Sequence, residues 1–142
     1  MGSVPEQDTF PELPLPIRHE AAPSTIDKGT RSEGAVLAAL LQLGYNVLLP
    51  FGVARYDLVI ETTAGFKRVQ CKTARFFEAS ITFSTISKGK RYNGDVDYFG
   101  VHEPASGHVY MVPIEAVGRR RSVYLRVNGK PGGRDAKQFQ IA

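Results

Sequence analysis

Residues 55–73, RYDLVIETTAGFKRVQCKT, contain two runs of mainly β-branched, aromatic and other apolar residues around a short loop with a glycine. This pattern is typical of a β-hairpin, and we expect strands at 55–61 and 66–73 joined by a turn at 62–65. Successive side chains of a strand alternate between its faces, so Gln70 and Lys72 should share one face. Cys71 should face the opposite way, into the core. The amide and the lysine form either ordinary solvated surface or part of a binding site.

The segment before this hairpin has the pattern of an amphipathic helix. Thr30 and Glu33 match a capping box, and Gly44 suits the C-terminal end of the helix. Apolar residues recur between them at helical spacing, at Val36, Leu37, Leu40 and Leu41.

Further strands are expected on both sides of the hairpin. Before it, we expect a strand at 45–50. After it, the patterns predict a strand at 80–87, a basic loop at 88–95, a second hairpin from 98–102 and 108–113, a short helix near 114–117, a strand at 122–127 and a turn at 128–133. This order predicts an α/β domain with a mixed β-sheet flanked by helices.

Composition suggests a leader and one folded domain. Residues 1–27 hold five of the nine prolines and no sustained hydrophobic period, so we expect a flexible Pro-rich leader there and the domain at 28–142. The longest apolar run is too short to span a bilayer, and no signal-peptide pattern is present. The one cysteine excludes an internal disulfide, which fits the reducing cytoplasm. We therefore expect a cytoplasmic protein without membrane association.

The basic charge is concentrated in the expected domain. The chain carries a net charge of +4, but residues 1–27 contain five acidic residues and one basic residue, which leaves +8 for residues 28–142. Such a charge either favours a polyanionic partner or merely keeps the domain soluble.

Two acidic residues are candidates for chemistry. Glu33 lies at the edge of the apolar stripe of the predicted helix, although it would also be the capping partner of Thr30. Asp57 interrupts an apolar strand, where an unpaired carboxylate is costly and a bound cation would offset that cost. The alternative is an ion pair with a nearby basic residue: Arg55, Lys67 or Arg68.

Pairing within the hairpin would bring Asp57 close to Gln70 and Lys72. A carboxylate, an amide oxygen and a lysine suit metal-assisted cleavage of a phosphodiester, because Mg²⁺ prefers oxygen ligands and activates water. Lys72 would orient that water or stabilise developing negative charge. Glu33 would hold a metal-bound water or a second ion from the helix.

Glu33, Tyr56-Asp57 and Gln70-x-Lys72 together resemble the signature of the PD-(D/E)XK nuclease superfamily. The stretch from Lys28 to Arg75 looks like the branch that includes group I intron homing endonucleases. The later VDYFGVHEPASGHVYMVPIEAV, residues 96–117, resembles the strands that follow in that branch. The resemblance implies a restriction-endonuclease-like core and DNA cleavage with Mg²⁺, for which Mn²⁺ substitutes.

The same resemblance assigns the site. It implies four catalytic residues, Glu33, Asp57, Gln70 and Lys72, with Glu33, Asp57 and Gln70 as metal ligands. Two positions depart from the signature. Tyr56 replaces a proline that carries no chemistry, and Gln70 replaces the second acid, as in some branches, which removes one negative charge from the site. An enzyme and a non-catalytic DNA-binding module on the same fold are both compatible with Gln70.

Basic residues around the site are candidates for gripping phosphates, or else are solvated surface charges. They are Arg75, Lys88, Lys90, Arg91, Arg119, Arg120 and Arg121. The leading hypothesis is a metal-dependent DNA endonuclease that acts as a homo-oligomer, a dimer or tetramer, because one small domain covers a short DNA site. A nuclease for branched DNA or structured RNA is a further alternative.

Overall fold

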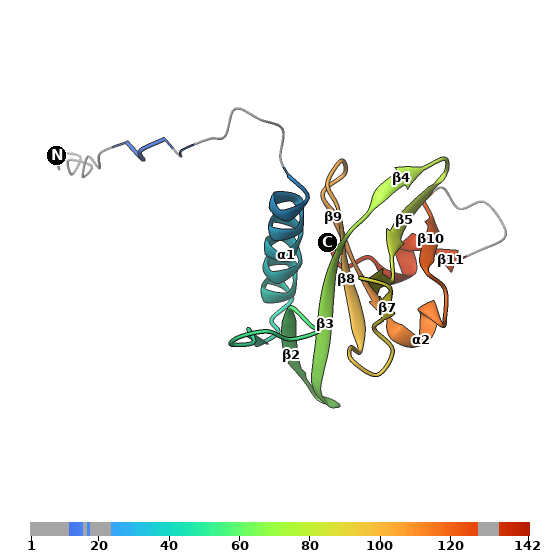
Figure 1. Ribbon diagram of the computed structural model, residues 1–142. Coiled ribbons are helices and arrows are strands. Elements are labelled where there is room, and N and C mark those ends of the chain that lie inside the picture. Colours follow the sequence, from blue (N-terminus) through green and yellow to red (C-terminus); the bar gives the residue numbers. More distant parts are fainter. Residues whose placement is uncertain (1–11, 16, 18–23, 128–133) are drawn as a thin grey trace, which may run out of the picture.

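The computed structural model describes residues 12–15, 17, 24–127 and 134–142, and its elements are drawn in Figure 1. The helices are α1 (Thr25–Gln42), α2 (Ile114–Val117) and the 3₁₀ turn η1 (Ala136–Phe139). The strands are β1 (Val47–Leu48), β2 (Leu58–Thr62), β3 (Gly65–Thr73), β4 (Arg75–Phe77), β5 (Ser80–Ser84), β6 (Ile86–Ser87), β7 (Lys90–Arg91), β8 (Tyr98–Glu103), β9 (His108–Pro113), β10 (Ser122–Arg126) and β11 (Arg134–Asp135).

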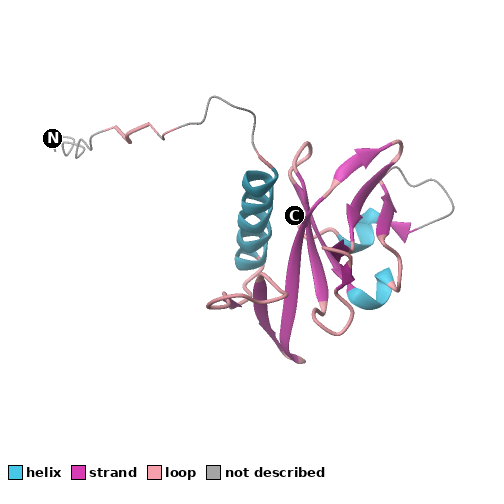
Figure 2. Cartoon of the chain, viewed as in Figure 1, coloured by secondary structure: helices cyan, strands magenta, loops and turns pink. Residues whose placement is uncertain are grey.

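The strands form two main sheets (Figure 2). The larger sheet has the order β1-β2-β3-β8-β9, in which β3 and β8 are parallel and the other neighbours antiparallel. The second sheet has the order β11-β10-β5-β4, and β6 and β7 form a small ribbon of their own. The predicted α/β fold around a mixed sheet is therefore confirmed.

Helix α1 covers one face of the larger sheet. Its buried residues Val36, Ala39 and Leu40 pack with Leu58 of β2 and with Val69 and Cys71 of β3. The other face of that sheet packs against the four-stranded sheet and α2, with the fully buried Phe99 between Phe83 and Tyr92. The sheet is thus flanked by a long helix on one side and mainly by a second sheet on the other.

The predicted start of α1 is wrong. The N-cap is Ser24, and Asp27 completes the capping box, with Ser24 N–H donating to Asp27 Oδ2 at 3.0 Å. Thr30 lies inside the helix and donates its hydroxyl to Ile26 O. Two capping patterns follow each other in the sequence, and Gly29 lowers helix propensity between them by about 1 kcal/mol relative to Ala. The first three residues of α1 therefore fall within the range 1–27 predicted as leader, and Glu33 is no capping residue.

Most of the other local predictions are confirmed. Both hairpins form, the first with Thr62 opposite Gly65, and the short helix spans Ile114–Val117 as expected. Three strands differ from the expected ranges. Strand β1 has only two residues, the strand expected at 80–87 divides at Thr85 into β5 and β6, and the expected basic loop contains β7. The predicted turn at 128–133 lies outside the described residues. No helix among the described residues is long and apolar enough to cross a membrane.

The contact between α1 and β8 depends on Gly100. A Cβ at this position would lie 2.6 Å from Val36 Cγ1 and 3.1 Å from Val69 Cγ1. We expect Gly100→Ala to lower the free energy of unfolding by about 1–3 kcal/mol, because valine side chains are stiff and α1 must move. Denaturant unfolding measures this change.

Gly34 provides the matched control for this substitution. It lies in α1, and a Cβ added there would meet no atom of another element within 4 Å. Gly34→Ala should raise stability by about 0.5–1 kcal/mol through helix propensity. Equal effects of the two substitutions would contradict close packing at Gly100.

Candidate active site

The four residues predicted to form the site line one open cleft. The cleft has a volume of about 490 Å³ and lies where the first turns of α1 meet the start of β2 and the C-terminal half of β3. Glu33, Asp57, Gln70 and Lys72 all line it. Around them lie Thr25, Lys28, Gly29, Cys71, Thr73, Ser87 and Tyr92. The structure thus brings the four residues together, and their catalytic roles remain a prediction.

Asp57 is held by the backbone of β3. It lies immediately before β2 and not inside the strand, which corrects the expected strand at 55–61. Its N–H donates to Val69 O at 2.9 Å, and its Oδ2 accepts from Cys71 N–H at 2.9 Å. Since β2 begins at Leu58 while β3 continues to Thr73, the carboxylate replaces a strand partner for the Cys71 N–H.

The alternative ion pairs of Asp57 do not form among the described residues. Arg55 Nε donates to Asp95 Oδ2 at 3.3 Å, and Arg68 Nε donates to Asp97 Oδ2 at 3.3 Å. Asp57 therefore uses one carboxylate oxygen in a structural hydrogen bond and also lines the cleft that Glu33 and Lys72 line.

Burial has the largest effect on the pKa values of the two carboxyl groups in the cleft. It raises the pKa of Asp57, while the Cys71 N–H and the charge of Lys72 act in the opposite direction. Burial raises the pKa of Glu33 as well, and the negative charge of Asp57 raises it further. Two carboxylates with raised pKa values in one cleft are the arrangement that a bound cation relieves.

Lys72 is positioned by groups from the β5–β8 connection. Its Nζ donates to Ile86 O at 3.3 Å and lies 4.7 Å from the ring centroid of Tyr92. Arg55 contacts the same ring, with Cζ 4.3 Å from the centroid. Burial lowers the pKa of Lys72, and Asp57 opposes that change. Tyr92 lies in the segment 88–95 that was expected to be a loop, yet it is only 5% exposed and its ring contacts Lys72.

Cys71 is a core residue, as predicted. It is 8% exposed and packs with Val36 and Val69 beneath α1. Burial raises the pKa of its thiol, and the charges of Asp57 and Glu33 add to that effect. The thiol therefore stays protonated and unreactive at neutral pH.

A polar cluster fixes α1 directly beside Glu33. The buried Ser32 Oγ lies 2.6 Å from Thr73 Oγ1 and 3.1 Å from His102 Nδ1. These contacts join α1 to β3 and β8 one residue away from both Glu33 and Lys72. Nothing in the local pattern identified them, because the partners are 41 and 70 residues from Ser32 along the chain.

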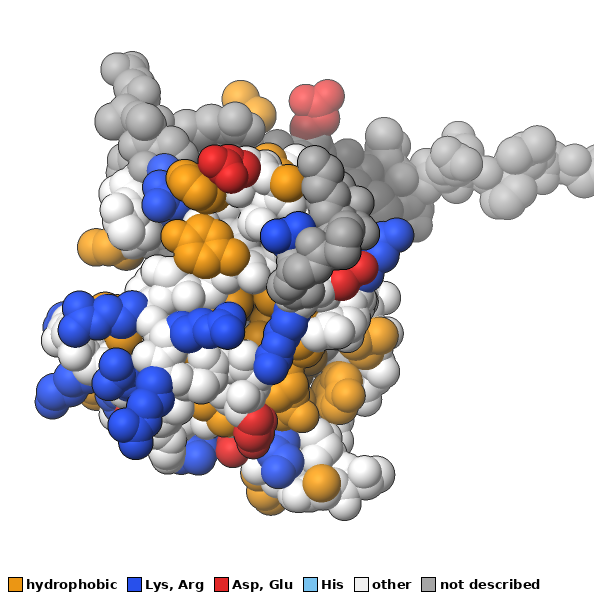
Figure 3. All heavy atoms as spheres, turned by 90° about the vertical axis from the view of Figure 1, so that its right-hand side faces the viewer, with side chains coloured by type: hydrophobic (Ala, Val, Ile, Leu, Met, Phe, Trp, Pro, Cys, Tyr) orange, Lys and Arg blue, Asp and Glu red, His pale blue; other side chains and the backbone are white. Residues whose placement is uncertain are grey.

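Six of the predicted DNA-binding residues come from two chain segments that lie side by side. Arg91 Nε donates to Arg119 O at 3.2 Å, and Thr85 N–H donates to Arg121 O at 2.9 Å. All six are exposed: Lys88, Lys90, Arg91, Arg119, Arg120 and Arg121. Figure 3 shows Lys and Arg side chains spread over one face of the molecule, with fewer acidic ones. The seventh, Arg75, is exposed on β4.

The ligands available to a metal are two carboxylates and an amide. No group of three or more His, Cys, Asp or Glu side chains suited to a metal occurs among the described residues. Glu33 on α1, Asp57 before β2 and Gln70 on β3 nevertheless bring side-chain oxygen atoms to one cleft. Oxygen donors with net negative charge fit a hard divalent cation.

Comparison with known proteins identifies the family. The family model of the PD-(D/E)XK endonucleases matches residues 23–142, and the chain belongs to this family. The fold is similar to that of a bacterial homing endonuclease, I-Ssp6803I, with a TM-score of 0.65 and 21% sequence identity over 83% of this chain and 87% of that chain. No curated protein sequence matches the chain. The family and the restriction-endonuclease-like fold predicted from the sequence are confirmed, and PD-(D/E)XK nucleases generally use divalent metals.

The raised pKa of Asp57 has a consequence for stability. We expect Asp57→Asn to preserve the fold, since the amide oxygen still accepts from Cys71 N–H, and to raise the unfolding temperature of the metal-free protein at neutral pH. A carboxyl group whose pKa is raised in the folded state destabilises that state at pH values above its unfolded pKa of 3.8. At lower pH it has no effect on stability, because it is protonated in both states. The gain should therefore shrink as the pH falls toward 3.8, as thermal unfolding at several pH values would measure. A gain that persists at low pH would contradict the electrostatic origin.

Proposed function

We propose that this protein is an endonuclease that hydrolyses DNA phosphodiester bonds with Mg²⁺, for which Mn²⁺ substitutes. The observation that carries the proposal is the shared cleft of Glu33, Asp57, Gln70 and Lys72, in which both carboxylates have raised pKa values. Such a cleft is expected in a family of metal-using nucleases to which the chain belongs.

Glu33, Asp57 and Gln70 would hold the metal through their oxygen atoms. When bound, the ion would polarise the scissile phosphate and lower the pKa of a coordinated water. Asp57 is held in place by its two backbone hydrogen bonds to β3, so its free oxygen needs little reorganisation to bind an ion. Gln70 brings no charge, which leaves the site less negative than one with three carboxylates.

Lys72 would supply positive charge where negative charge develops on the phosphate. Its ammonium group is held by the Ile86 carbonyl and the Tyr92 ring and is partly shielded from water. A donor fixed before the reaction stabilises the transition state without having to reorganise during the reaction. Burial lowers the pKa of Lys72, and the negative charge of Asp57 opposes this change and favours the charged ammonium group.

The exposed basic residues would bind the DNA backbone. The segments 88–91 and 119–121 form one surface through the contact of Arg91 with Arg119 O. Lysine and arginine at such positions neutralise phosphates and release counterions, which makes binding salt-dependent without reading bases. A homo-oligomer, dimer or tetramer, belongs to the proposal because a single domain of 15.6 kDa covers a short stretch of DNA.

Lys72→Ala tests the catalytic site. We expect it to reduce cleavage of plasmid DNA with Mg²⁺ or Mn²⁺ by at least ~10²-fold, because the developing charge loses its fixed donor. Plasmid nicking followed on gels measures the rate, and circular dichroism verifies the fold. Binding to DNA should change little.

Lys67→Ala is the control, because Lys67 lies on the same strand but near the hairpin turn, opposite Ile60. It should cleave like the wild type. Cleavage that persists in a pure Lys72→Ala preparation would refute the proposed site. A wild-type protein that binds DNA but never cleaves it would instead be the non-catalytic module.

Gln70→Glu tests the metal ligands without relying on activity. The added carboxylate should destabilise the metal-free protein and increase the rise in unfolding temperature that Mg²⁺ or Mn²⁺ produces, since binding to the folded state stabilises it. Asp57→Asn should show almost no such rise. Differential scanning fluorimetry with and without the metal measures both changes, and an equal metal response in the three proteins would contradict metal binding by this cleft.

A further inference from the structure

The outer face of the four-stranded sheet carries a row of polar side chains across three strands. Arg75 on β4 lies opposite Thr82 on β5, which in turn lies opposite Tyr124 on β10. Two residues further along β5, Ser84 lies opposite Ser122 on β10. The intervening residues of β5 and β10 face the core, so these side chains occupy the opposite face of the sheet.

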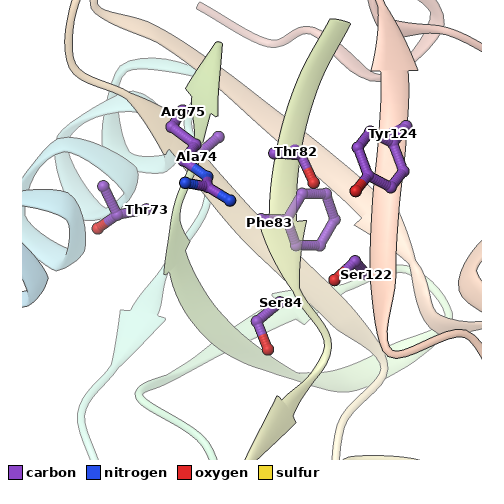
Figure 4. Close-up of a pocket in the computed structure, with 8 residues that line it drawn as sticks. All are labelled: Thr73, Ala74, Arg75, Thr82, Phe83, Ser84, Ser122 and Tyr124. Carbon is purple, nitrogen blue, oxygen red and sulfur yellow. The ribbon is translucent and has the colours of Figure 1, made fainter. Parts of the chain in front are cut away.

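These side chains surround a second hollow, separate from the catalytic cleft. Its volume is about 360 Å³, and Figure 4 shows its eight lining residues, with the Arg75 guanidinium beside β5 and the hydroxyls of Thr82 and Tyr124 on neighbouring strands. None of these eight described residues is acidic. The hollow therefore offers one cation and several hydroxyl donors, with no negative charge to repel an anion.

This chemistry matches the backbone of a nucleic acid. Arginine, serine, threonine and tyrosine side chains commonly contact phosphate and sugar oxygens in protein–DNA complexes. The core of a stable interface between two copies of a chain is mainly apolar, which the hydroxyl-lined hollow is not. The exposed ring of Tyr124 makes an edge contact with the ring of Phe77, whose centroid lies 5.9 Å away on the same face of the sheet.

The hollow adjoins the candidate active-site cleft. Thr73 lines both, and β3, which carries Gln70 and Lys72, passes through Ala74 directly into β4. Arg75 follows Lys72 by three positions, roughly 10 Å along an extended chain.

We propose that the exposed residues Arg75, Ser84, Ser122 and Tyr124, which lie around the buried Thr82, form a second DNA-contact surface, which binds the sugar–phosphate backbone of the duplex beside the scissile phosphate. The proposal rests on the proposed DNA endonuclease function and adds a contact that the basic segments 88–91 and 119–121 do not provide. It extends the bound duplex from Lys72 along β4 onto β5 and β10.

The test measures DNA affinity in the absence of metal, so that cleavage does not contribute. The probe is a fluorescently labelled duplex of two helical turns, about 20 base pairs, titrated at several salt concentrations. Arg75→Gln should weaken binding by about tenfold and reduce the slope of log affinity against log salt by about 0.9, the value for one lost phosphate contact. The double variant Tyr124→Phe/Ser122→Ala removes two hydroxyls and no charge, so it should weaken binding several-fold with the slope unchanged.

Lys67→Gln is the matched control for charge, because Lys67 lies near the opposite end of β3 and should leave affinity unchanged. Binding of both surface variants at wild-type affinity would overturn this proposal while leaving the endonuclease function intact. A change of oligomeric mass in light scattering without loss of DNA affinity would overturn it too, in favour of a contact between copies. A wild-type protein that binds the duplex through this surface but never cleaves DNA would instead refute the proposed function alone.

Discussion

Strand β3 continues past the residue at which β2 begins, so the edge of β3 has no strand partner there. The carboxylate of Asp57 takes the place of that partner. Asp57 accepts from the Cys71 N–H while its own N–H donates to Val69 O. Because both bonds go to β3, the acid is held within a few ångströms of the strand that carries Gln70 and Lys72. The mismatch in strand length thus creates the site, and the same extended strand leads from the cleft into the second sheet.

The two carboxylates of the cleft repel each other, and other contacts keep the surrounding elements together. Burial and the proximity of Asp57 both raise the pKa of Glu33, so the two carboxylates disfavour each other's charge when no cation is present. Contacts that involve neither acid keep α1 against the sheet, namely the packing of Val36 over Gly100 and the cluster of Ser32 with Thr73 and His102. Packing and neutral hydrogen bonds therefore offset the cost of placing two carboxylates in one cleft.

A series of aromatic contacts links the candidate site to the second sheet. Phe99 packs against Phe83 of the second sheet and against Tyr92, whose ring also contacts Lys72. These ring contacts thus link the β5–β8 connection to Lys72 on β3. The basic segment 88–91 lies within this connection, and Arg91 Nε joins it to the basic segment 119–121 by donating to Arg119 O.

The sequence by itself determined the elements whose partners are close along the chain. Both hairpins and the helix Ile114–Val117 follow from turn residues and alternating patterns within short segments, and the residues that resemble the family signature led to the correct family. The helix start was mispredicted because two capping patterns compete and local sequence alone does not choose between them. Only the tertiary structure decided the parallel pairing of β3 with β8, the Asp57–Cys71 bond and the Ser32 cluster. These contacts depend on which strand ends first and which distant side chains meet after packing, and no local pattern encodes that.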